Sequence, residues 1–139
     1  MRFELEKILF TKYPKIFEQK DNSMDRTCMC WGIECGDGWY ELIDDLCGTI
    51  QHYIDSVEFY RGGGWVKPKQ IKAVQVKEKF GTLRFYTDIR DERVEGMISV
   101  AEYRSSTTCE RCGSRNNVTQ SEGWIVTLCN ECHKKRQDN

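Results

Sequence analysis

Four cysteines near the end of the chain constrain its fold more than any other feature. Cys109 and Cys112 are separated by two residues, Cys129 and Cys132 are separated likewise, and sixteen residues lie between the two pairs. This spacing is typical of a segment that folds around one tetrahedral zinc ion. We therefore predict that the four thiolates bind zinc. The ion is expected to be structural, because four protein ligands leave no position for a catalytic water.

The residues around these cysteines predict a zinc finger over residues 105–139. Gly113 permits a tight turn after the first pair, and a polar turn then leads to a short hairpin through Val118 and residues 124–126. The second pair opens a short helix, and a helix N-terminus stabilises thiolates. We call the turn with the first cysteine pair the knuckle. The order of knuckle, hairpin and helix resembles a treble-clef zinc finger.

The rest of the chain, residues 1–104, is predicted to form one domain of helices and a β-hairpin. The 139 residues are 39% hydrophobic and 12% aromatic, which is sufficient for a buried core. Apolar residues at helical spacing predict helices over residues 1–12, over residues 38–55, and from Asp88 or Asp91 to about Arg104. The predicted fold class is therefore α+β, with a treble-clef-like zinc finger at the C-terminal end.

The second predicted helix has the clearest pattern, and Asp37 is placed to cap its N-terminus. Its apolar stripe consists of Trp39, Leu42, Ile43, Leu46, Ile50 and Tyr53. The opposite face carries His52 among several carboxylates. We interpret this face as solvated in preference to a metal site, because an amphipathic helix needs a polar face.

The central part of the chain alternates as β-strands do. Successive side chains of a strand point to opposite faces. The face that we predict to pack on the core carries Val74, Val76 and Phe80, and the other face carries Lys77 and Lys79. The pattern fits two strands paired in a hairpin, or one long strand broken by a glycine bulge.

The other four cysteines admit two interpretations. Cys28, Cys30, Cys35 and Cys47 are either packed, reduced side chains, which we favour, or the ligands of a second zinc ion. A secreted disulfide scaffold is the less favoured use of eight cysteines, because the chain shows no signal peptide and has paired metal-ligand spacing.

The charges are unevenly distributed, although the net charge is only −1. Residues 1–60 contain six basic and twelve acidic residues, whereas residues 61–86 contain seven basic and one acidic. Solvated faces and internal charge pairing are the simpler explanation. The alternative is a nucleic-acid-binding surface, whose candidate residues are Lys77, Lys79, Arg84, Arg111, Lys134, Lys135 and Arg136.

The sequence shows no set of residues that is typical of a catalytic site. The residues around the second cysteine pair resemble the closing segment of HNH endonucleases, which need a histidine as general base. Neither histidine nor aspartate occurs between the two cysteine pairs, and His133 stands beside the fourth ligand. We therefore predict that the chain is not an enzyme, and a degenerate HNH-like or unrecognised enzyme is the least favoured alternative.

The sequence also predicts where the protein is found. No apolar run approaches the ~18–20 residues that cross a bilayer. The first residues are acidic and unlike a signal peptide. The expected location is the cytoplasm, without membrane attachment.

Three parts of the sequence resemble a family of small bacteriophage and prophage proteins without an established activity. They are residues 31–39, residues 76–86 and the two cysteine pairs. The resemblance implies an accessory protein in the cytoplasm of an infected bacterium, where such proteins commonly bind host machinery and many inhibit bacterial immunity. Because the pI is 6.1 and no catalytic set is present, we expect a protein partner first and nucleic acid second.

Overall fold

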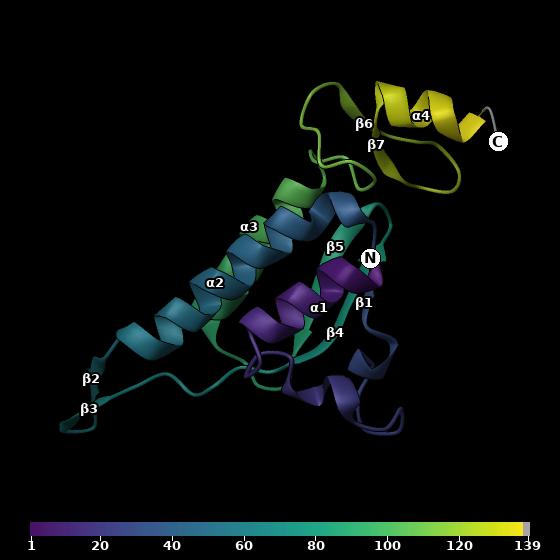
Figure 1. Cartoon of the computed structure of the whole chain (residues 1–139). Coiled ribbons are helices and arrows are strands. Elements are labelled where there is room, and N and C mark those ends of the chain that lie inside the picture. The colour runs from purple at the N-terminus through teal and green to yellow at the C-terminus, as the bar shows by residue number, and fades with distance from the viewer. Residues whose placement is uncertain (138–139) are drawn as a thin grey trace.

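The computed structural model describes residues 1–137 and combines four α-helices with small sheets (Figure 1). The α-helices are α1 (Phe3–Lys12), α2 (Tyr40–Ser56), α3 (Glu92–Ser105) and α4 (Asn130–Gln137), and short 3-10 turns span Glu18–Asp21, Met29–Trp31 and Asp37–Trp39. The strands are β1 (Ile33–Glu34), β2 (Phe59–Arg61), β3 (Gly64–Val66), β4 (Ala73–Lys79), β5 (Thr82–Thr87), β6 (Val118–Gln120) and β7 (Thr127–Cys129). The mixed α+β composition confirms the broad fold class. The predicted finger segment, residues 105–139, ends two residues beyond the described part.

The three sheets are small and separate. The largest has the order β1-β4-β5, in which β1 runs parallel to β4 and β5 runs antiparallel to it. Of the two predicted arrangements for the central strands, the hairpin is the correct one. The other sheets are the antiparallel pairs β2-β3 and β6-β7. In Figure 1, α2 runs from the C-terminal segment (residues 109–137) at one end of the molecule to the β2-β3 hairpin at the other.

A large hydrophobic core lies between the helices and the main sheet. All six residues of the predicted apolar stripe of α2 are buried in it. Helix α1 contributes Leu9, and α3 contributes Val94, Ile98 and Ala101, as its spacing predicts. The Asp91 carboxylate caps α3 by accepting hydrogen bonds from two backbone N–H groups, which decides between the two predicted caps. A second, smaller cluster of buried residues belongs to the C-terminal segment.

The predicted N-cap of α2 is wrong. Helix α2 begins at Tyr40, after a 3-10 turn, and Trp39 occupies the N-cap position without a side-chain cap. The carboxylate of Asp37 instead accepts a hydrogen bond from the backbone N–H of Arg2 at 2.7 Å and pairs with the Arg2 guanidinium. Asp37 therefore ties the start of the chain to α2, a long-range role that local spacing does not indicate.

The prediction that Phe80 faces the core is also wrong. Lys79 pairs with Thr82, so that Phe80 and Gly81 form a two-residue hairpin loop and Phe80 leaves the strand alternation. The Phe80 side chain is 68% exposed. Val76 is buried as predicted, whereas Val74 is only half-buried, because the register shifts between Ala73 and Gln75.

Among residues 1–137, we find no helix with both the length and the hydrophobicity that spanning a membrane requires.

Candidate metal centre

The four cysteines that the sequence pairs come together in the structure. The Sγ atoms of Cys109, Cys112, Cys129 and Cys132 all lie within 4.8 Å of one another. Four ligands of a tetrahedral zinc ion, each about 2.3 Å from the metal, stand about 3.8 Å apart. The Sγ atoms of Cys112 and Cys129 are separated by 3.7 Å, which matches that spacing and is far longer than a disulfide bond. These four side chains are placed to hold a metal ion, and the geometry is compatible with zinc.

Backbone hydrogen bonds shape the loop that carries the first pair. Gly113 donates to the Cys109 carbonyl at 2.8 Å, and Cys109 donates to the Ser114 carbonyl at 2.8 Å. Gly113 adopts a φ of +78°, which residues with a side chain rarely reach. The second pair comes from a strand end and a helix start, since Cys129 closes β7 and Cys132 lies in the first turn of α4.

The four thiols interact with one another and with backbone N–H groups, and these contacts shift the pKa values of three of them in different directions. Burial alone would raise the pKa of Cys109, but hydrogen bonds from backbone N–H groups of Cys129, Cys112 and Arg111 lower it to about 7. The pKa of Cys132 is raised by burial and by hydrogen bonds with the neighbouring thiols. A cation between the four sulfur atoms would stabilise all four as thiolates.

The loop with the first cysteine pair is docked closely on residues 36–39, which include the 3-10 turn that precedes α2. Gly38 donates its backbone N–H to the Glu110 carbonyl at 2.8 Å, and the Gly36 N–H donates to the Glu110 carboxylate at 2.9 Å. The buried indole of Trp39 donates to the Thr108 carbonyl at 2.9 Å. The sequence does not predict these contacts. Glu110 lies between Cys109 and Cys112, and no sequence motif indicates that it bonds to residues 36–38.

The remaining cysteines are not gathered into a second centre. Within residues 1–137, the four thiolates above are the one group of three or more cysteine, histidine or carboxylate ligands that come together. Burial raises the pKa of Cys35 to about 12 and raises that of Cys47 as well, as expected for thiols packed in the core. Cys30 donates weakly to the Thr27 carbonyl, and Cys28 is exposed. The interpretation as packed thiols therefore fits Cys35 and Cys47, whereas Cys30 is half-buried and Cys28 lies on the surface.

The candidate basic residues divide between two places, and the first is the β4-β5 hairpin. Lys77 and Arg84 stand opposite each other across this hairpin. Arg84 donates to Thr82 and to the Leu83 carbonyl and lies 3.9 Å from the Glu102 carboxylate, so its charge serves the fold. Lys79 lies over the ring of Phe80, with its Nζ 5.5 Å from the ring centroid.

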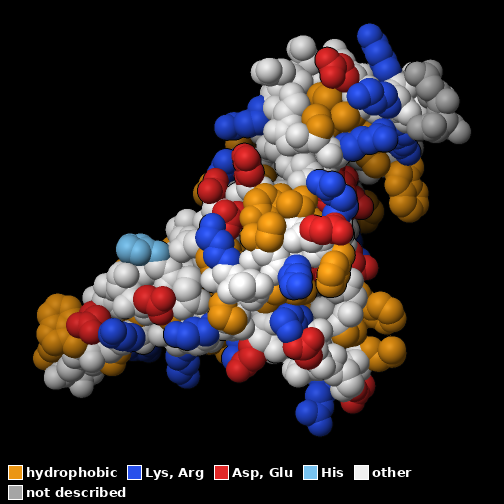
Figure 2. Space-filling model, in the orientation of Figure 1, with side chains coloured by type: hydrophobic (Ala, Val, Ile, Leu, Met, Phe, Trp, Pro, Cys, Tyr) orange, Lys and Arg blue, Asp and Glu red, His pale blue; other side chains and the backbone are white. Residues whose placement is uncertain are grey.

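The other four candidates belong to the C-terminal segment. Arg111 is exposed on the knuckle, and Lys134, Lys135 and Arg136 occupy the last turn of α4, where positive charge complements the helix dipole. Figure 2 shows lysine and arginine side chains gathered over this end of the molecule and mixed with acidic side chains over the rest of the same face.

Each of the two histidines lies beside a hydroxyl group. The ring Nε2 of His133 lies 3.2 Å from the Thr119 carbonyl oxygen and 3.3 Å from the Thr119 hydroxyl. His52 is exposed on α2, as the sequence predicts, and its Nδ1 lies near the Ser56 hydroxyl. Both imidazoles have local structural partners.

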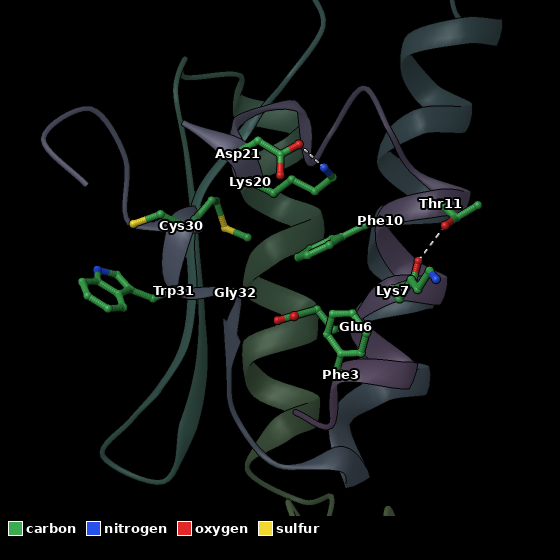
Figure 3. A pocket seen from close by; sticks show the side chains of 11 residues that line it. Phe3, Glu6, Lys7, Phe10, Thr11, Lys20, Asp21, Cys30, Trp31 and Gly32 are labelled. Carbon is green, nitrogen blue, oxygen red and sulfur yellow. Dashed lines mark hydrogen bonds and ion pairs between the residues drawn. The ribbon is translucent and has the colours of Figure 1, made fainter. Parts of the chain in front are cut away.

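A hollow of about 490 Å³ lies between α1 and the Met29–Trp31 turn (Figure 3). Glu6 and Phe10 project into it from α1, whereas the indole of Trp31 points away. Its acidic groups already have partners, because Glu6 accepts from the Ile33 N–H at 2.5 Å and Asp21 pairs with Lys20. Both carboxylates therefore have partners within the protein, and neither indicates a bound ligand.

Comparison with models of known protein families, with curated proteins and with solved structures yields no significant match in any of the three. The resemblance to bacteriophage proteins therefore stays a prediction.

Proposed function

We propose that this chain is a non-enzymatic, zinc-stabilised accessory protein that binds another protein through a surface next to its metal centre. In this proposal the C-terminal segment is a treble-clef-like finger whose zinc is structural. The observation that carries the proposal is the conformation of a single exposed residue, Phe80.

Phenylalanine at position 80 is unfavourable for the stability of the hairpin loop. Both central residues of this two-residue loop have positive φ, +53° at Phe80 and +75° at Gly81. Such type I′ loops favour Asn-Gly, and an aromatic residue with positive φ costs about 1 kcal/mol or more. The exposed Phe80 ring regains little of that by burial. Strain of this kind gathers at functional sites, which supports a role for Phe80 in binding.

The metal centre supports the surface around Phe80. Next to Phe80, the buried Gly81 lies against Ile125, and its carbonyl accepts a hydrogen bond from the Thr127 hydroxyl. Ile125 in turn follows Trp124, whose side chain is 78% exposed. We call Phe80, Trp124 and Ile125 the junction surface. Its two parts come from the β4-β5 hairpin and from the C-terminal segment, so a folded metal centre is needed to assemble it.

The chemistry of the junction surface favours a protein over nucleic acid. Exposed aromatic side chains are enriched where proteins bind proteins, and they supply most of the hot spots. The charged residues next to this surface in the sequence are net negative, because Lys79 is accompanied by Glu78 and Glu122. A phosphate backbone requires a clear excess of positive charge. The proposed setting, the cytoplasm of an infected bacterium, and a role as an inhibitor of anti-phage defence rest on the sequence resemblance.

Replacing Phe80 with asparagine is expected to stabilise the fold while abolishing partner binding. The Phe80→Asn variant creates the preferred Asn-Gly loop and should raise stability by about 1 kcal/mol, or the melting temperature by about 3 °C. Thermal unfolding followed by circular dichroism measures this gain. An unchanged or lowered melting temperature would show that Phe80 contributes to folding, and the argument from strain would then fail.

Binding is tested with a photo-crosslinking residue at position 80, in bacteria with and without infecting phage. Proteins captured there should be missing when the crosslinker replaces Tyr103, an equally exposed aromatic residue on α3. Purified partner should then bind the wild-type chain and the Tyr103→Ser variant alike, but not Phe80→Asn. Equal binding by all three would contradict the junction surface as the binding site.

A further inference from the structure

A second group of exposed aromatic residues lies at the opposite end of the molecule, on the β2-β3 hairpin (Figure 1). Tyr60 and Trp65 are 65% and 71% exposed. They face each other across the two strands, with ring centroids 5.8 Å apart and an interplanar angle of 75°. Figure 2 shows hydrophobic side chains at this tip with acidic and basic ones beside them.

The alternation of the strands separates the two faces of this hairpin. Phe59 lies on the face opposite Tyr60 and Trp65, and the guanidinium of Arg93 on α3 stacks over its ring at 5.4 Å. The same guanidinium lies 5.8 Å from the ring of Tyr53 on α2. One face therefore anchors the hairpin to the helices, and the aromatic pair faces away from that contact.

The charge around the aromatic pair is positive, in contrast to the chain as a whole. Residues 57–70 contain three basic residues and one acidic residue, whereas the whole chain has a net charge of −1. Lys67 lies 3.8 Å from Glu58 in an exposed pair. Arg61 and Lys69 form no ion pair with any residue from 1 to 137, and so are available to phosphates.

The approach to the aromatic rings is open. A methyl group added at Gly62, Gly63 or Gly64 would meet nothing within 4 Å, so the tip of the hairpin is unobstructed. Proteins that bind single-stranded nucleic acid combine exposed aromatic rings, on which bases stack, with basic side chains along the backbone path. Base pairs of a duplex stay stacked on one another and offer no such free face.

We propose that the β2-β3 hairpin binds single-stranded nucleic acid, with bases stacking on Tyr60 and Trp65 and phosphates contacting Arg61 and Lys69. This site is independent of the junction surface and lies at the other end of α2. The two proposals therefore fail separately: a change at Trp65 leaves the protein partner bound, and a change at Phe80 leaves the nucleic acid bound.

The test uses the 139-residue chain purified with zinc, together with fluorescein-labelled oligo(dT), oligo(U) and a DNA duplex of equal length. Fluorescence anisotropy at low salt should show binding to both single strands and much weaker binding to the duplex. Trp65→Ala and Tyr60→Ala should each weaken the affinity by about fivefold to a hundredfold, the usual effect of losing one stacked base. Lys69→Ala should reduce the slope of log affinity against log salt by about 0.7.

Two controls separate stacking from other effects. Tyr103→Ala removes an equally exposed tyrosine from α3 and should leave the affinity unchanged. Trp65→Leu keeps an apolar side chain but removes the aromatic face, so it should bind as weakly as Trp65→Ala. The proposal is overturned if neither single strand binds at low salt, if Trp65→Ala binds as tightly as wild type, or if Trp65→Leu does so.

Discussion

Removing the metal, or replacing Cys129 with serine, should unfold the C-terminal segment while the main core persists. The buried hydrophobic residues of this segment are Cys109, Leu128, Cys129 and Cys132, and three of these four belong to the cysteine cluster that is placed to hold the metal. Val118 and Val126 add only partly buried surface. So few apolar side chains cannot offset the conformational entropy of about thirty residues. We therefore expect metal binding to supply the folding free energy of this segment, as zinc binding, worth about 10–16 kcal/mol, does in zinc-finger peptides.

Elemental analysis and amide hydrogen exchange measure this outcome. Protein purified without chelator should contain one zinc per chain, and Cys129→Ser or strong chelation should remove it. Amides of residues 109–137 should then exchange rapidly, whereas those of α2 stay protected. The matched control is Cys28→Ser, which changes an exposed cysteine outside the centre and should keep the zinc. Protected amides throughout the metal-free segment would refute a metal-dependent fold.

The cluster of four cysteines and the helices could be predicted because their patterns are local. Two cysteines separated by two residues form one turn, and the stripe on α2 needs only the regular geometry of a helix. The same reasoning places the start of α3 within a few residues, since a cap bonds to nearby N–H groups. In each case the physical cause lies within about twenty residues of sequence.

The features that were missed depend on contacts between distant segments. Asp37 has the composition of a helix cap but is engaged by Arg2, and no local rule distinguishes these uses. Phe80 continues the strand alternation in sequence and lies in the loop only because Lys79 pairs with Thr82. The adjacent glycine was the available signal, since a two-residue loop that ends in glycine is typical of hairpins. The role of Glu110 follows only from the docking of its loop on residues 36–38, before α2.

That docking leads to the second large effect: replacing Gly38 with alanine should detach the C-terminal segment from the core. A Cβ atom at Gly38 would lie 2.2 Å from the Cys109 carbonyl oxygen and 2.4 Å from the Gly113 nitrogen. Both are backbone atoms of the metal-binding knuckle, so no side-chain rotation relieves the overlap. We expect a loss of about 3 kcal/mol or more, which lowers the melting temperature by about 10 °C.

Zinc content distinguishes this variant from the loss of a ligand. All four ligands lie within residues 109–132, so Gly38→Ala should retain one zinc per chain although docking is lost. The emission of Trp39, whose buried indole bonds to Thr108, should shift towards that of an exposed indole. Gly96→Ala is the matched control, because Gly96 is exposed in α3 with nothing near it, and alanine there should stabilise the helix by about 0.5–1 kcal/mol. If Gly38→Ala melted at the wild-type temperature, the close contact between the turn before α2 and the loop with the first cysteine pair would not exist in solution. The metal centre could then not support the junction surface in the way we propose.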